Sequence, residues 1–361
     1  MAVLFAGGAC LSRQVLMKPF FIAAGDFERI VRVWAGEKPV YAPVTYGDHR
    51  SWARLSPEAV GPLELDGIRA VEPLKTFYFR VRETVATYPG DTSFLDDEPG
   101  FVLIGAKNCD LRSLECLDKA FADSEPRDPF WVSRREKALV VGADCSDPAS
   151  TCFCTLLDME PYPQACFDLS VAVVSGGLVV EVGSEKGRKA LDAVDGITLG
   201  EATAEQLAER DENRQRTRET VTTQNRQFET ERPFTELVQT GYQSPAWTKY
   251  AGRCREDAAC LAICPTCHCF VLYDQSKGES NERIRVWDFC YLRGYTRCGG
   301  GHTARATGSD RFKNKYVKKF EFFPAKFQMV ACTGCGRCIE ACLAKIDMRQ
   351  VLHDVEESRG E

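Results

Sequence analysis

The sequence predicts an N-terminal domain of the α/β or α+β class, followed by a smaller, cysteine-rich domain at the C-terminus. Three observations indicate this division. Short apolar runs alternate with helical spacing in the first half of the chain. The 18 cysteines gather mainly in two groups, at residues 109–166 and 254–342. A charged stretch with few large apolar side chains separates the groups, and we interpret it as the domain boundary.

The first domain, residues 17–200, contains a predicted strand–helix–strand unit. Residues 101–105 (FVLIG) and 138–142 (ALVVG) are short apolar runs of the kind found in buried strands. Between them, apolar side chains recur at helical spacing from Leu111 to Phe121. Residues 169–182 then predict a β-hairpin with glycines in its turn.

Two further segments are predicted from composition. Residues 1–16 precede a more ordinary start at Met17, and we interpret them as an N-terminal extension. No basic segment opens them, as a secretory signal would require. Residues 201–240 are predicted to form a charged linker that is helical or partly mobile.

The bulk composition narrows the function. A secreted disulfide scaffold is not expected, because such proteins are usually short and this chain has 361 residues. We expect a cytoplasmic protein whose thiolates bind metal. The net charge of −6 argues against nucleic-acid binding, and no apolar run is long enough for a membrane span. No glycine-rich nucleotide fingerprint is present, so the chain is not expected to bind NAD(P)H or ATP itself.

The strongest motif lies at residues 332–342, CTGCGRCIEAC. Its spacing, C-x2-C-x2-C-x3-C, is the iron–sulfur run of bacterial ferredoxins. Iron prefers soft thiolate ligands, and Gly334 and Gly336 suit a loop that folds tightly around a cluster. The fourth cysteine of such a run usually ligates a second cluster, which requires a second run. Residues 241–361 are therefore predicted to form a bacterial-ferredoxin-like dicluster domain.

The second run is present in altered form at residues 254–265, CREDAACLAICP. Asp257 stands where its second cysteine would be expected. Paired CxxC motifs also occur in zinc sites, but zinc does not explain two interlocking runs. Crossed ligation predicts two 4Fe–4S clusters: the first held by Cys254, Cys260 and Cys342 with Asp257, the second by Cys264, Cys332, Cys335 and Cys338.

Asp257 changes the expected chemistry of the first cluster. A carboxylate is a harder ligand than a thiolate and holds its iron less firmly. Three outcomes are open: an oxygen-ligated 4Fe–4S cluster, loss of one iron to give 3Fe–4S, or replacement by another thiol. The alternative is that Asp257 is only a solvated helix residue. We expect ligation or an open iron.

A third cluster is predicted in the first domain. Cys109 and Cys145 each follow one of the predicted strands, and Cys152 and Cys154 share one loop. Ligand sites gather beyond the carboxyl ends of adjacent parallel strands, so these four thiols are expected to converge. A zinc site, or buried cysteines without metal, are the alternatives.

Several residues of the second domain have no assigned role. Cys267, Cys269 and Cys290 could replace the missing ligand, form another metal site, or pack around the clusters, and we prefer packing. His268 could be a ligand, but a lone histidine is more often a hydrogen-bonded core residue. Residues 311–327 carry six basic residues interleaved with aromatics. We expect this segment to dock on a partner, or to form a solvated face that raises a cluster's potential, rather than to bind RNA; the acidic net charge favours docking.

Several longer motifs resemble a known family. The matching runs are GAKNCDLRSLECLDKAF (105–121), CPTCHCF (264–270), RIRVWDFC (283–290) and GGGHTARAT (299–307). With the ferredoxin runs, they make the chain similar, over most of residues 20–352, to the β subunits of cytoplasmic NiFe sulfhydrogenases and to the corresponding subunit of anaerobic sulfite reductase. Those proteins are 4Fe–4S dicluster electron-transfer subunits. The family pattern has cysteine at position 257, so the departure bears on the potential of that cluster.

The resemblance implies a middle link in a hetero-oligomeric, anaerobic oxidoreductase complex. A flavoprotein subunit exchanges electrons with NAD(P)H, and this chain relays them to or from a separate catalytic subunit. No activity of the chain alone is then expected. The alternative function is a reductase that performs catalysis at an open iron of the Asp257 cluster.

Overall fold

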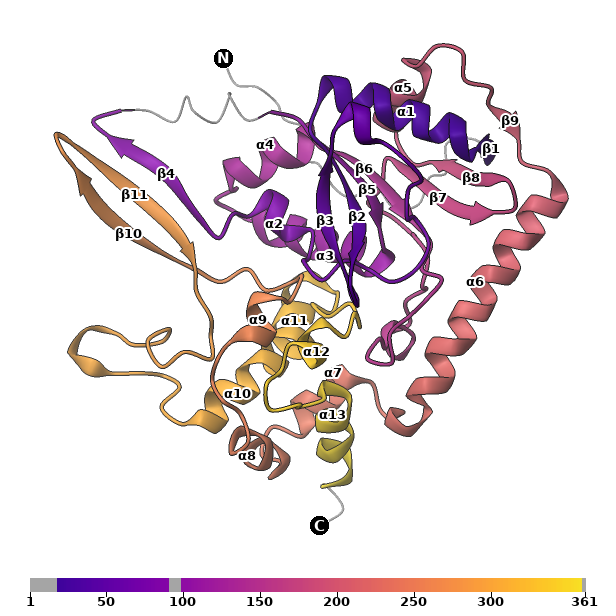
Figure 1. Cartoon of the computed structure of the whole chain (residues 1–361). Helices are drawn as coiled ribbons and strands as arrows, with labels where there is room; N and C mark the ends of the chain where they lie inside the picture. Colours follow the sequence, from indigo (N-terminus) through magenta and orange to yellow (C-terminus); the bar gives the residue numbers. More distant parts are fainter. Residues whose placement is uncertain (1–17, 91–98, 359–361) are drawn as a thin grey trace. The chain divides into compact units, whose positions relative to one another are not determined.

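A computed structural model of the chain describes residues 18–90 and 99–358, so the predicted extension at residues 1–16 lies outside the described residues. The chain divides into two compact units (Figure 1). The N-terminal unit takes the chain up to Tyr78 and then residues 93–223. The C-terminal unit takes residues 79–92 and everything from Gln224 onward.

An eight-stranded sheet forms the centre of the N-terminal unit, in the order β3-β2-β5-β6-β7-β8-β1-β9. The pairs β2–β5, β5–β6 and β6–β7 are parallel, and the strands on either side pair antiparallel. The two predicted strands correspond to β5 and β6, and the predicted hairpin to β7 and β8. The strands are β1 (Phe20–Ala23), β2 (Val40–Tyr46), β3 (His49–Leu55), β5 (Val102–Ala106), β6 (Leu139–Ala143), β7 (Leu169–Val174), β8 (Gly177–Val182) and β9 (Gly200–Glu201).

Helices cover both faces of this sheet. On one face, α1 (Ala24–Glu37) buries Phe27, Ile30, Val31 and Trp34, a helical stripe that packs with Val141 of β6. On the other face, Leu111 of α3 (Asn108–Phe121) lies over Gly142. Covering on both faces explains why β5 and β6 are apolar throughout. The remaining helices of this unit are α2 (Lys75–Tyr78), α4 (Pro129–Lys137), α5 (Glu185–Asp192) and most of α6 (Ala204–Asn225).

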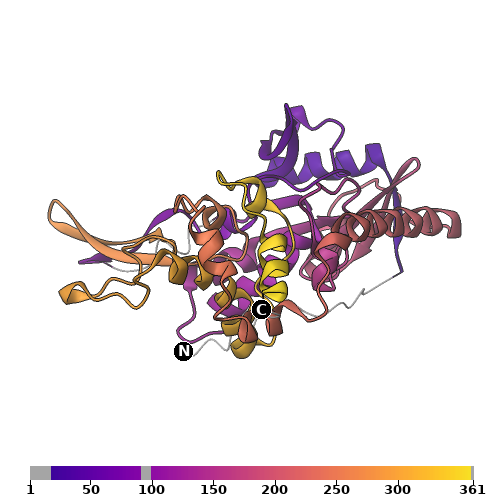
Figure 2. The same cartoon turned by 90° about the horizontal axis from the view of Figure 1, so that it is seen from below.

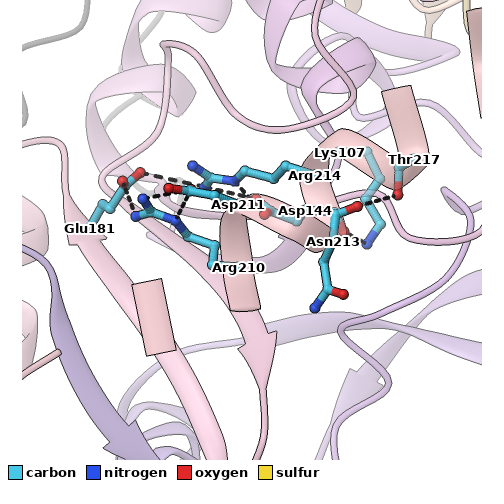
Figure 3. A network of polar contacts seen from close by, with 8 residues as sticks. All are labelled: Lys107, Asp144, Glu181, Arg210, Asp211, Asn213, Arg214 and Thr217. Atoms are coloured by element: carbon cyan, nitrogen blue, oxygen red, sulfur yellow. Dashed lines mark hydrogen bonds and ion pairs between the residues drawn. The ribbon is translucent and has the colours of Figure 1, made fainter. Parts of the chain in front are cut away.

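The charged stretch after the sheet forms α6, and its arginines fasten it to the sheet (Figure 3). The guanidinium of Arg214 donates to both carboxylate oxygens of Asp144, at 2.6 and 3.1 Å. Arg210 donates to Glu181 of β8 at 3.0 Å. Leu207 adds an apolar contact with β7 and β8. A helix with few large apolar residues is thus held largely by ion pairs.

The C-terminal unit combines a three-stranded antiparallel sheet with short helices. The sheet has the order β10 (Phe270–Lys277), β11 (Ser280–Trp287), β4 (Arg82–Tyr88), and its β10–β11 hairpin projects from the helical part of the unit (Figure 2). The helices are α7 (Phe234–Thr240), α8 (Ala246–Ala251), α9 (Ala259–Ala262), α10 (Gly308–Val317), α11 (Phe323–Phe327), α12 (Arg337–Glu340) and α13 (Met348–Glu357). A π-helical turn, Lys318–Phe322, joins α10 to α11. Short 3-10 turns occupy Pro57–Ala59, Cys154–Leu157, Arg226–Phe228 and Gly299–Gly301.

Buried apolar side chains from distant segments hold the C-terminal unit together. Trp247 of α8 and Tyr316 of α10 pack with ring centroids 5.1 Å apart, and Phe234 of α7 packs on Phe320 of the π turn. A capping box at Thr307 and Asp310 begins α10. In the described parts of the chain, no helix is both long and apolar enough to cross a bilayer.

Candidate metal centres

The two cysteine runs fold alike. Each passes through a residue with left-handed backbone, Ala258 (φ 59°) in the first and Gly336 (φ 73°) in the second, directly before a four-residue helix. Gly334 is left-handed as well, with φ 61°, as the sequence predicted for this loop. The two short helices, α9 and α12, pack against each other. The runs are therefore neighbours, as crossed ligation requires.

The first group of thiols joins the two runs. Burial raises the pKa values of Cys254 and Cys260, and the negative charge of Cys342 raises both further. Cys342 belongs to the second run, so this influence places it beside two thiols of the first. Backbone N–H groups face these sulfurs: Glu256 N lies 3.4 Å from Cys254 Sγ, and Ile346 N lies 3.4 Å from Cys342 Sγ.

The second group of thiols is also crossed. Burial raises the pKa of Cys332 to about 12 and that of Cys338 to about 11. The charge of Cys264, from the first run, contributes to both raised values, and the charge of Cys335 contributes to that of Cys338. Cys264 therefore lies with the three cysteines of the second run.

Two lysines of the basic segment are buried at these thiols. Nζ of Lys319 lies 3.2 Å from Sγ of Cys264 and donates to Thr266 Oγ1 and to the Ala331 carbonyl, at 2.7 and 2.8 Å. Burial alone would lower the pKa of Lys315, but the charges of Cys260 and Cys338 raise it well above its usual value. Lys315 thus stands near one thiol of each group.

This placement corrects the interpretation of residues 311–327 as a docking surface. Arg311, Lys313, Lys315 and Lys319 are all buried, and Lys315 and Lys319 face thiols. The available signal was the four-residue spacing of Lys315 and Lys319, which places both on one face of a helix. Basic residues are seldom fully buried without a partner, so the sequence alone favoured a solvated position.

The spacing of the sulfurs distinguishes a cluster from a single metal ion. Within each unit, no three of the described cysteine sulfurs lie within 4.8 Å of one another; the group that meets this criterion is His353, Asp354 and Glu357. Four thiolates on one zinc ion, each about 2.3 Å from it, would hold their sulfurs about 3.8 Å apart. The wider spacing here, with cations and backbone N–H groups around the thiols, fits a multi-iron cluster.

Asp257 lies at the edge of the first thiol group. Its side chain is exposed, and its Oδ1 accepts the backbone N–H of Ala259, the first residue of α9, at 2.8 Å. Its charge also raises the pKa of Cys254, after burial and the effect of Cys342, so the carboxylate is near that thiol. Its exposure fits the solvated residue that the sequence offered as the alternative, and its place beside Cys254 leaves ligation of iron a prediction.

Three thiols predicted for the first domain lie together in the N-terminal unit. Burial raises the pKa of Cys154, and the charges of Cys152 and Cys145 raise it further. Cys145 follows β6, and Cys109 lies in the first turn of α3, directly after β5. Since β5 and β6 are adjacent and parallel, Cys109 and Cys145 leave the same edge of the sheet.

This group also has a buried cation. Nζ of Lys107 donates to the carbonyls of Leu65 and Asp144, both at 2.7 Å, and its charge lowers the pKa of Cys145 against the larger effect of burial. Lys107 and Arg214 of α6 belong to one polar network, because both donate hydrogen bonds to Asp144 (Figure 3).

The other cysteines and His268 take varied positions. Nδ1 of His268 lies 2.9 Å from the Thr266 carbonyl, which gives the ring a backbone partner. Cys116 is buried in α3, Cys298 is exposed, and Cys166 is disulfide-bonded. Cys269 and Cys290 lie near each other, because the charge of Cys269 raises the pKa of Cys290 beyond the effect of burial.

Comparison with known proteins agrees with this geometry. The family model of the 4Fe–4S dicluster domain matches residues 253–346, inside the C-terminal unit, so the predicted fold class is confirmed. The chain is 30% identical over 325 residues to sulfhydrogenase 2 subunit beta of Pyrococcus furiosus, covering 88% of this chain and 92% of that protein. No solved structure matches the chain.

Proposed function

Because the chain belongs to the family of iron–sulfur electron-transfer subunits that includes the sulfhydrogenase β subunit, we propose that it relays electrons between a flavin-bearing, NAD(P)H-linked subunit and a separate catalytic subunit. The observation that carries this proposal is the pair of crossed thiol groups, with Lys315 near one thiol of each. Adjacent redox sites joined by buried protein are what a relay needs. The anaerobic, cytoplasmic setting is part of the same proposal.

The proposed ligands divide into three sites. Bound 4Fe–4S clusters would supply one-electron redox chemistry, while the protein sets their potentials and keeps water away. Burial of the thiols and the neighbouring ammonium groups supports this division of tasks. The ligands are Cys254, Asp257, Cys260 and Cys342 for the first cluster; Cys264, Cys332, Cys335 and Cys338 for the second; and Cys109, Cys145, Cys152 and Cys154 for a third in the N-terminal unit.

Lysines in the C-terminal unit have a defined part in this proposal. A thiolate-ligated cluster is anionic and becomes more so on reduction, so a nearby buried cation favours the reduced form. Lys319 contacts Cys264 directly, and Lys315 acts on Cys260 and Cys338. We expect both lysines to raise cluster potentials.

The exposure of Asp257 favours one alternative function. An iron held by a weak, solvent-exposed ligand is accessible to a small substrate, so a reductase with catalysis at that iron is the second candidate. Because Asp257 is exposed, the first cluster can exist as 3Fe–4S or as an oxygen-ligated 4Fe–4S cluster. Substitution at Asp257 separates these cases, as described below.

Metal analysis and partner analysis test the main proposal. The chain, purified without oxygen, should contain iron and acid-labile sulfide, in equal amounts if every cluster is 4Fe–4S and with one iron fewer than sulfide if the first is 3Fe–4S, and it should give the EPR signals of reduced 4Fe–4S clusters. Affinity purification from its native cells should recover a flavoprotein and a second redox subunit, and NADH or NADPH should reduce the clusters only when the flavoprotein is present. Zinc without labile sulfide, or reduction by NAD(P)H of the isolated chain, would contradict the proposal.

A further inference from the structure

Three cysteines outside the crossed groups lie around the base of the β10–β11 hairpin. Cys269 directly precedes β10, and its carbonyl accepts the N–H of Asp288, just beyond β11, at 3.0 Å. This pairing brings Cys290, two residues further on, to the same end of the hairpin. Cys290 is 4% exposed. The negative charge of Cys269 raises the pKa of Cys290, so the two thiols are neighbours.

Cys267 connects this pair with the second crossed group. Its charge acts on Lys319, as do those of Cys264 and Cys332. The N–H of Cys267 also donates to the Cys264 carbonyl at 3.3 Å, in a tight turn. Cys267 and Cys269 are therefore presented from one short loop, next to a site already lined with thiols.

A third lysine of the same helical segment faces these cysteines. Nζ of Lys318 lies 3.9 Å from Sγ of Cys269 and donates to the Tyr295 hydroxyl at 3.2 Å. That hydroxyl in turn donates to Cys269 Sγ at 3.3 Å. Lys315 and Lys319 lie near thiols of the two crossed groups. Lys318 is the corresponding cation beside Cys269 and Cys290. The ammonium of Lys318 is partly buried, and the thiol of Cys269 is a negative partner within its reach when it is ionised.

An independent observation comes from Asn314 of α10. Its side chain is 2% exposed, and neither amide atom makes a hydrogen bond to a nitrogen or oxygen atom of the described residues. The amide nevertheless lies close enough to Cys290 to lower the pKa of that thiol. The described partner of the Asn314 amide is thus a thiol of this site. Cluster sulfurs accept hydrogen bonds, so this buried amide is placed to donate to a cluster bound at Cys290.

We propose that Cys267, Cys269 and Cys290 bind an additional iron–sulfur cluster in the C-terminal unit, with Lys318 and Asn314 beside it. Three thiolates leave one iron of a 4Fe–4S cluster to a non-thiolate ligand, or hold a 3Fe–4S cluster. The matched dicluster domain accounts for two clusters, so this one is additional to it.

Iron and sulfide analysis tests the proposal. The full-length double variant Cys269→Ser/Cys290→Ser, purified without oxygen, should contain about four sulfides fewer per chain than the wild type, with about three irons fewer for a 3Fe–4S cluster or about four for a 4Fe–4S cluster. The EPR signals of the other clusters should persist. Cys298→Ser is the matched control, because Cys298 is an exposed thiol of the same segment, and it should lose nothing. Unchanged iron and sulfide in the double variant would show that these thiols only pack.

A second measurement needs no variant. In wild-type protein with its clusters bound, Cys267 and Cys269 should resist alkylation, and mass spectrometry should find them labelled only after iron has been removed. Both side chains are only partly buried, so packing alone gives them little protection. The exposed Cys298 should be labelled throughout. Labelling of Cys267 and Cys269 at the rate of Cys298, while the EPR signals persist, would overturn the proposal.

Discussion

Nζ of Lys319 lies 3.2 Å from Sγ of Cys264, and Lys315, one helical turn earlier, acts on Cys260 and Cys338. These two buried lysines are thus matched to thiols rather than to carboxylates. Such an ammonium opposes the negative charge that accumulates when thiolates and a cluster occupy the site. This electrostatic pairing leads to measurable consequences for potential, stability and metal content.

Removing the charge of Lys315 should lower the midpoint potentials of both C-terminal clusters. We expect Lys315→Met to shift each by about 60 mV, the one-electron equivalent of a tenfold change in equilibrium constant. EPR-monitored redox titration measures this shift. Lys315→Arg keeps the charge, and Lys326→Met removes an exposed charge further along the same segment; both should titrate like the wild type. Potentials unchanged in Lys315→Met would refute the electrostatic role.

Substitutions at Asp257 should separate its two roles. Asp257→Asn retains an oxygen that can accept the Ala259 N–H, but it removes the carboxylate. If the carboxylate ligates iron, Asp257→Asn should change the EPR spectrum, and Asp257→Cys should bring the cluster to four irons with a thiolate-type spectrum. If Asp257 only accepts this N–H, Asp257→Asn should match the wild type in spectrum and thermal stability. Identical EPR spectra for the wild type and both variants would also rule out the alternative function, a reductase with catalysis at an open iron.

Breaking the ion pair between Arg214 and Asp144 should destabilise the N-terminal unit. Asp144 is largely buried and precedes Cys145, so Arg214→Met leaves an uncompensated carboxylate beside the third thiol group. We expect a loss of about 3–5 kcal/mol in the free energy of unfolding, measured with urea. Arg216→Met, on the exposed side of α6, should be nearly neutral. Recovery of stability in Arg214→Met/Asp144→Leu would show that the unpaired carboxylate of Asp144 causes the destabilisation of Arg214→Met.

The proposed third cluster can be removed by itself. Cys154→Ser should lower iron and sulfide by about four each per chain, or leave an altered cluster spectrum, while the C-terminal clusters keep their EPR signals. Cys116→Ser is the control, because Cys116 is buried in α3 and is not a proposed ligand. A loss of zinc rather than iron in Cys154→Ser would favour the zinc alternative instead.

The iron-free chain should lose stability at alkaline pH. Burial raises the pKa of Cys332 to about 12 and of Cys338 to about 11, above the ordinary thiol value of about 9. Between these values the unfolded thiols release protons that the folded ones retain, so the free energy of unfolding falls as pH rises from about 9 to 12. Urea titrations of iron-free protein at several pH values measure the slope. Cys332→Ser/Cys338→Ser should reduce it, and an equal slope in that variant would contradict this assignment.

Patterns within short stretches of sequence predicted two kinds of element: strands buried on both faces and loops that carry a cysteine motif. The apolar runs predicted β5 and β6, the helical spacing of apolar residues predicted α3, and the two cysteine runs share the spacing of ferredoxin ligands. β4 was not predicted, because its residues alternate weakly and its partner, β11, is distant in the sequence. Long-range pairing leaves little trace in a local window.

The buried lysines escaped prediction for a different reason. Residues 311–327 have the composition of a surface, and their burial depends on thiols that come from other segments. No pattern within the segment reports those thiols. A charge can be buried only where an opposite charge offsets its desolvation, and that partner is visible only in three dimensions.

The π-helical turn between α10 and α11, Lys318–Phe322, depends on its exact number of residues. The N–H of Phe323 donates to the carbonyl of Lys318, so the Lys319 carbonyl is free to accept the N–H of Ala331 at 3.0 Å, directly before Cys332. Deleting one residue from the turn would wind it into an α-helix and return the Lys319 carbonyl to the helical ladder. The start of the second cysteine run would then lose its anchor. Insertions and deletions here should therefore be more harmful than exchanges of its side chains.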